Sequence, residues 1–173
     1  MMPWKLLQER RADFASRRAA ENQGLDDSQF LGQIAFDNDL TDRRIAVVLR
    51  KLVARECGID PGLLRPDDLT SDLEEIMGAP GFVGWLFGGR YGFEFHSVFY
   101  GLEGGLSETF GRRVLLKEKS VVKLRMFARD EKWAPDPKQT LGDWIALAAR
   151  EIRELIGEMP AGAGGSTVTG GVS

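Results

Sequence analysis

A single amphipathic segment, from Asp42 to Cys57, does most to limit this chain to a helical fold. Its apolar residues recur at the i, i+3, i+4, i+7 and i+8 spacing that lines one face of an α-helix. They are Ile45, Val48, Leu49, Leu52 and Val53. Arg43, Arg44, Arg50 and Lys51 fall outside this stripe and are expected at the surface. Thr41 or Asp42 can cap the start of the helix, and Gly58 can end it.

A second apolar stripe lies between Gly92 and Gly111. Its residues share one face at about 100° per residue; they are Phe95, Val98, Phe99, Leu102, Leu106 and Phe110. Ser97 falls on the opposite side, and Gly111 is a typical helix stop. Three further glycines lie inside the segment, each costing a helix about 1 kcal/mol relative to alanine. They predict either a close contact with another helix or a bend.

The first forty residues predict helices of a different character. Pro3 to Ala20 has a sparse apolar stripe of Trp4, Leu7 and Phe14 among many arginines. One interpretation is a basic amphipathic helix for an anionic membrane or an acidic partner. The favoured interpretation is a helix that lies on the domain with its charges solvated. After Gly24, an Asp27-Ser28 cap is expected to start a short helix with Phe30, Leu31 and Ile34.

The segment from Asp60 to Leu73 predicts an ordered loop, because Pro61 and Pro66 prevent a continuous helix. Its leucines would pin it to a core. A last helix is expected from Thr140, with Thr140 as its cap and Asp143 at the capping-box position. Its buried face would contain Trp144, Ile145, Ala148, Ile152 and Leu155. The Gly, Ala, Ser and Thr-rich end of the chain predicts a disordered tail.

Composition narrows the functional classes. A net charge of −3 gives no basic excess of the kind that nucleic-acid binding needs. One cysteine, Cys57, excludes an internal disulfide and is expected to be packed rather than reactive, and one histidine, His96, excludes most metal and Ser-His-Asp sites. No apolar run approaches the roughly 20 residues of a membrane-spanning helix. We therefore expect a cytoplasmic protein without stable membrane anchoring, metal or nucleic acid.

The order of these features resembles that of acyl carrier proteins and peptidyl carrier domains. Leu106-Ser107-Glu108-Thr109-Phe110-Gly111 is similar to the Leu-Glu-Glu-x-Phe-Gly ending of the family's second helix, and Thr140-Leu141-Gly142-Asp143-Trp144 is similar to the opening of its last helix. The family's hydrophobic crossover would correspond to Ile59, Leu64, Arg65-Pro66-Asp67-Asp68, Leu69 and Asp72-Leu73. The resemblance implies an all-α fold: a small four-helix acyl-carrier-like bundle with an N-terminal helical extension.

The resemblance also implies a function and a cofactor. Carrier domains bear 4′-phosphopantetheine on a serine at the start of the second helix, where the helix N-terminus favours the phosphodiester. Ser97 is the candidate for that serine, although an ungapped count back from Phe110 places His96 there. The chain would then be a divergent carrier that bears an acyl group, or one that keeps only a docking role. Its partners would be acyl-transfer or synthase enzymes.

The alternative interpretation is a helical protein-interaction module of unknown partner. An aromatic-rich segment would provide its surface, with Trp85, Phe87 and Tyr91 as the central residues. Neither interpretation makes the chain an enzyme, because no nucleophile with a base and an orienting partner is evident. The expected organisation is an N-terminal helical extension over residues 1–40, a carrier-like domain over 41–158 and a disordered tail over 159–173.

Overall fold

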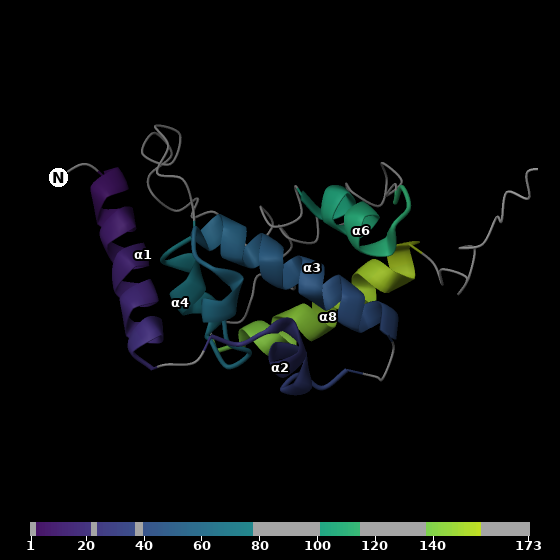
Figure 1. Cartoon of the computed structure of the whole chain (residues 1–173), viewed down its shortest axis with the longest axis horizontal. Helices are drawn as coiled ribbons and strands as arrows, with labels where there is room; N and C mark the ends of the chain where they lie inside the picture. Colours follow the sequence, from purple (N-terminus) through teal and green to yellow (C-terminus); the bar gives the residue numbers. More distant parts are fainter. Residues whose placement is uncertain (1–2, 22–23, 37–39, 78–100, 115–137, 157–173) are drawn as a thin grey trace, which may run out of the picture.

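The computed structural model describes residues 3–21, 24–36, 40–77, 101–114 and 138–156. Within these ranges the chain is helical and contains no strand, as expected for an all-α protein. Figure 1 shows the elements, which are α1 (Pro3–Ala20), α2 (Asp27–Gly32), α3 (Leu40–Cys57), the 3₁₀ helix η1 (Pro61–Leu63), α4 (Thr70–Glu74), α6 (Leu102–Phe110) and α8 (Leu141–Ile156). The predicted disordered tail lies outside the described residues.

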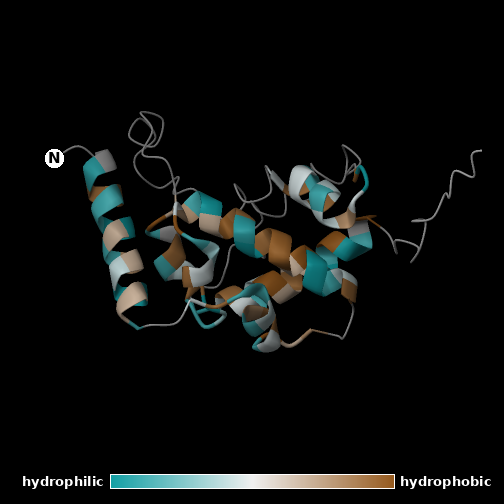
Figure 2. Ribbon diagram, in the orientation of Figure 1, coloured by the Kyte–Doolittle hydropathy of each residue, from teal (hydrophilic) through white to brown (hydrophobic). Residues whose placement is uncertain are grey.

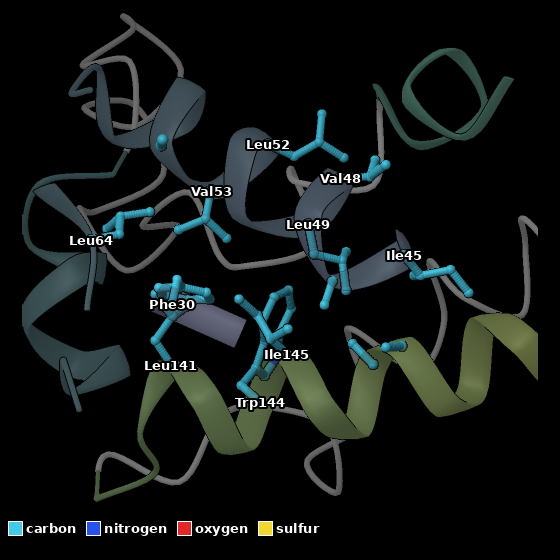
Figure 3. Close-up of a cluster of buried hydrophobic side chains, with 14 of the residues drawn as sticks. Phe30, Ile45, Val48, Leu49, Leu52, Val53, Leu64, Leu141, Trp144 and Ile145 are labelled. Atoms are coloured by element: carbon cyan, nitrogen blue, oxygen red, sulfur yellow. The ribbon is translucent and has the colours of Figure 1, made fainter. Parts of the chain in front are cut away.

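Helix α3 runs through the middle of the fold and buries two sides of its surface (Figures 1 and 3). Ile45, Leu49 and Val53 point toward α8 and Phe30, while Val48 and Leu52 point toward α6 (Figure 3). The predicted apolar stripe is therefore confirmed, but its residues pack against two different helices, α8 and α6. In Figure 2 the apolar residues of α3 and α8 gather where the two helices meet.

The predicted ends of α3 are partly confirmed. Gly58 follows the helix with a φ of 66°, the left-handed conformation that glycine adopts without strain. The helix begins at Leu40, so Thr41 and Asp42 lie inside its first turn instead of preceding it. Asp42 is buried and its Oδ2 accepts a hydrogen bond from Arg153 of α8 at 2.9 Å. This ion pair ties the start of α3 to the last turns of α8.

Helix α8 begins where the sequence predicts. The Thr140 hydroxyl oxygen accepts a hydrogen bond from the Asp143 backbone N–H at 3.2 Å, and the hydroxyl donates to the Asp143 carboxylate at 2.8 Å. Its expected inner face is buried at Trp144, Ile145, Ala148 and Ile152. Local capping and the 3.6-residue period are sufficient to predict this helix, because both signals are contained in its own sequence.

Replacing Thr140 with alanine should lower the free energy of unfolding by about 1 kcal/mol, the usual cost of losing an N-cap side chain. Thr140→Ser keeps the hydroxyl and should retain most of that stability. Urea unfolding followed by circular dichroism would measure both variants. Equal stability of the alanine and serine variants would show that the cap contributes nothing.

The crossover that follows α3 is ordered, as expected, but parts of it are helical. It contains η1 and α4, and Leu64 and Leu73 are fully buried. The backbone N–H groups of Leu141 and Gly142 donate to the carbonyl oxygens of Asp68 and Pro66 at 2.7 and 2.8 Å. Backbone hydrogen bonds thus hold the crossover on the start of α8, and Leu64 and Leu73 anchor it in the core, whereas Leu69 is exposed, contrary to expectation.

The two N-terminal helices pack onto this core. Phe14 of α1 and Phe30 and Leu31 of α2 belong to the same buried cluster as the residues of α3 and α8. Helix α2 is capped by Asp26, not by the expected Asp27-Ser28 pair, in a capping box with Gln29. The hydrogen bond from the Gln29 backbone lowers the pKa of Asp26. The predicted boundary at residue 40, between an N-terminal extension and a carrier-like domain, stays a prediction. Residues from both sides of it belong to the same buried cluster.

Candidate functional site

The residues singled out by the sequence lie outside the described residues. Ser97, the candidate attachment serine, and His96 beside it belong to the range 78–100. Trp85, Phe87 and Tyr91, the predicted partner surface, belong to the same range. The structure does describe the helix into which this range leads, α6, and the surface of α3 on which α6 lies. The description of the candidate site is therefore limited to α6 and α3, the helices that would support it.

Helix α6 approaches α3 closely through a glycine. A Cβ atom built on Gly105 would lie 2.6 Å from Cγ1 of Val48, too close unless the Val48 side chain or one of the helices shifts. Gly104, its neighbour, faces open space. Of the two outcomes that the glycines predicted, a close helix contact is the one found at Gly105.

The N-terminal end of α6 also lies against α3. Gly101 is its N-cap residue, and a Cβ atom there would lie 2.8 Å from Cδ2 of Leu52 and would also meet the Arg55 guanidinium. Helix α6 starts at Leu102, and the earlier part of the predicted apolar stripe, from Phe95 to Phe99, lies outside the described residues. Close contacts at both Gly101 and Gly105 fix the start of this helix on α3.

The C-terminal end of α6 is held from two sides. Gly111 adopts a φ of 63° and ends the helix, as expected. Arg44 of α3 lies over the Phe110 ring at 4.3 Å and donates a hydrogen bond to the Thr109 carbonyl oxygen. A cation at the C-terminus of a helix also interacts favourably with its dipole. Arg44 therefore links α3 to the end of α6, although its side chain is exposed.

Ser107 is the one serine of α6, and its hydroxyl is committed to the backbone. It donates to the Glu103 carbonyl oxygen at 2.7 Å and accepts a hydrogen bond from the Val114 N–H at 2.9 Å. The second bond turns the chain back toward the helix after Gly111. Because these bonds satisfy the hydroxyl, Ser107 is a structural residue of the scaffold and not a free attachment point.

Arg50 is a buried charge that the sequence pattern placed wrongly at the surface. Its side chain is only 1% exposed, and it forms an ion pair with Asp27 at 2.8 Å. It also donates to the Leu25 carbonyl oxygen at 2.7 Å and lies over the Phe30 ring at 4.3 Å. All three partners come from the segment around α2, which covers this side of α3. Periodicity within α3 cannot reveal a neighbour from another segment.

Cys57 is packed, as its sequence setting predicted. It is fully buried at the end of α3, and burial raises the pKa of its thiol to about 12. Nearby Arg11 of α1 acts in the opposite direction, lowering the pKa of the thiol. A thiol with so high a pKa is almost entirely protonated at neutral pH and therefore a poor nucleophile.

Three further observations limit the chemistry of the described residues. Within the described ranges, no group of three His, Cys, Asp or Glu side chains is placed to hold a metal ion. No described helix is both long enough and apolar enough to cross a membrane. Comparison with protein-family models, with curated proteins and with solved structures gave no match for this chain.

Proposed function

We propose that this chain is a divergent acyl-carrier-like protein that acts through partner enzymes and carries a phosphopantetheine arm on Ser97. The supporting observation is the mutual placement of three helices. Helix α6, with its Phe110-Gly111 ending, lies on α3, while α8 lies on another part of α3 and receives the pinned crossover. This placement supports the proposal, because the sequence resemblance implies that the second and last helices of a carrier both pack on its first helix.

The scaffold suits a protein that presents a group rather than transforms one. Glycine contacts at Gly101 and Gly105 and the contacts of Arg44 hold α6 at its start, middle and end. Ser97 precedes the first residue of α6, Leu102, by only five residues. A group attached to Ser97 would therefore be close in sequence to a helix that is held on α3. A carrier needs this combination because partner enzymes recognise the folded scaffold while the flexible arm reaches their active sites.

Co-expression with a broad-specificity phosphopantetheinyl transferase, followed by intact-mass measurement, tests the attachment. The wild-type chain should gain the mass of one arm, and Ser97→Ala should abolish the gain, since no other hydroxyl is expected to react. Ser28→Ala is the control, because Ser28 follows an aspartate, as the modified serine of the carrier family does, and is exposed on α2. The control should be modified like the wild type.

A chain that stays unmodified, while a standard carrier domain is fully modified in parallel, would overturn the arm. The remaining role would then be docking, for which the aromatic residues before α6 are the predicted surface. A pull-down with the wild type and with Trp85→Ala would compare how much partner each chain recovers. Equal recovery of the same partner by both would count against that surface.

A further inference from the structure

The side of α1 that faces the fold combines two apolar side chains with two arginines. Leu7, Arg11, Phe14 and Arg18 recur at helical spacing, and Leu7 and Phe14 are buried. The helix contains five basic and two acidic residues, whereas the whole chain has a net charge of −3. A basic helix therefore lies on a remainder that is acidic, and electrostatic attraction contributes to its docking.

Arg11 makes the central contact of this docking. Its guanidinium donates to the Ile76 carbonyl oxygen and to the Glu56 carbonyl oxygen, both at 3.0 Å. Glu56 lies in the last turn of α3, and Ile76 follows α4. A Cβ atom on Gly58 would lie 2.7 Å from a guanidinium nitrogen of Arg11, so the group lies directly over the turn that ends α3. One side chain thus binds the C-terminal ends of two helices.

Two further arginines of α1 face carboxylates of the fold. Arg18 forms an ion pair with buried Asp68 of the crossover, and Arg10 lies 3.8 Å from exposed Glu75. Among the α1 side chains that the structure describes, the buried apolar ones are Leu7 and Phe14, whereas α3 and α8 bury continuous faces. Segments with few buried apolar contacts open at lower free energy than the core of the same protein.

We propose that α1 is a latch that opens as a unit while α3, α6 and α8 stay packed, and that its opening uncovers Cys57. The thiol lies at the α3 end on which Arg11 is seated, and its pKa responds to the Arg11 charge. In the closed state Arg11 of the latch lies over Gly58, next in sequence to Cys57, and occupies the carbonyl oxygens of Glu56 and Ile76.

The labelling rate of Cys57 tests the latch in the full chain, because no other cysteine is present. N-ethylmaleimide modification, followed by mass spectrometry, should proceed under native conditions faster than global unfolding allows. Its denaturant dependence should be shallow, since only a small surface is exposed when one helix opens. The rate should also rise with sodium chloride concentration, because salt weakens the Arg10 and Arg18 pairs.

Arg11→Met should raise the labelling rate at least tenfold, equivalent to about 1.4 kcal/mol of lost latch stability. The substitution keeps an unbranched apolar stem and removes only the guanidinium. Arg17→Met is the matched control, since Arg17 is exposed on the same helix; its rate should equal that of the wild type. Arg11→Lys, which keeps the charge but not the fork of donors, should give an intermediate rate.

Two results would overturn the latch. One is an Arg11→Met rate equal to that of the wild type. The other is a wild-type rate that follows global unfolding across denaturant concentrations, because Cys57 would then be exposed only when the core unfolds. The second measurement uses the unaltered chain, so it decides the question even if the Arg11 variant proves too unstable to purify.

Discussion

Gly105→Ala should destabilise the protein, whereas Gly104→Ala, at the adjacent position of the same helix, should stabilise it. Alanine is better than glycine in a helix interior by about 1 kcal/mol, and Gly104 faces open space, so this gain should appear in full. At Gly105 the new methyl group would lie 2.6 Å from Cγ1 of Val48. Overpacking of this kind costs about 1–3 kcal/mol, which exceeds the propensity gain.

Urea unfolding of the two variants and the wild type would measure these opposite signs. A net loss of up to about 2 kcal/mol is expected for Gly105→Ala, and a gain of up to about 1 kcal/mol for Gly104→Ala. Adding Val48→Ala to the Gly105 variant removes the atom that clashes, so the double variant should be more stable than the two separate changes predict. Strict additivity would mean that α6 is not seated on Val48.

The same comparison also bears on the proposed function. If Gly105→Ala moves α6 away from α3, phosphopantetheinylation of Ser97 should slow while that of the Gly104 variant stays unchanged. Neither glycine has a group that the transferase could modify, so a difference between the variants would report the position of the helix. The scaffold would then be shown to serve the transferase as well as the fold.

Sequence reasoning worked where the signal was local. The period of α3, the glycines that end α3 and α6, and the Thr140 cap of α8 are each contained in one short segment. A helix that buries a continuous face shows that face in its own sequence. These features were therefore predictable without knowledge of any neighbour.

Sequence reasoning failed where a contact joined distant segments. Arg50 was assigned to the surface because it lies outside the apolar stripe of α3, yet the α2 segment covers it. The docking of α1 through Arg11 is likewise absent from the pattern, since a backbone carbonyl has no sequence signature. The short helix α4 was missed because only five residues form it, fewer than periodicity needs.

The candidate site also has a part that was predicted and is described, and a part that remains a prediction. The helices that support it were predicted and are described, including the Phe110-Gly111 end of α6. Ser97 and the aromatic residues Trp85, Phe87 and Tyr91 remain predictions, because they lie outside the described residues. The case for a carrier therefore depends on the order and contact of helices, and the intact-mass experiment decides the chemistry.

Asp27→Ala should cost more stability than Arg50→Met, although both changes break the same ion pair. The Arg50 side chain is 1% exposed, and burial lowers its pKa while the hydrogen bond with Asp27 opposes that shift. Without Asp27 the buried guanidinium keeps the Leu25 carbonyl oxygen, the Phe30 ring and the charges of Asp60 and Asp26, and its Nε already has no hydrogen-bond partner. A buried charge that loses its partner is strongly unfavourable.

We expect a loss of about 2–3 kcal/mol for Asp27→Ala, below the upper range for buried pairs because the Asp27 side chain is 42% exposed. Arg50→Met should cost less than about 1.5 kcal/mol, since methionine can fill the space beside Phe30 while Asp27 turns to water. The double variant should be about as stable as Arg50→Met alone. Asp13→Ala, on the exposed side of α1, controls for the loss of one carboxylate. A greater loss for Arg50→Met than for Asp27→Ala would show that the guanidinium itself, and not its neutralisation, holds α2 on α3.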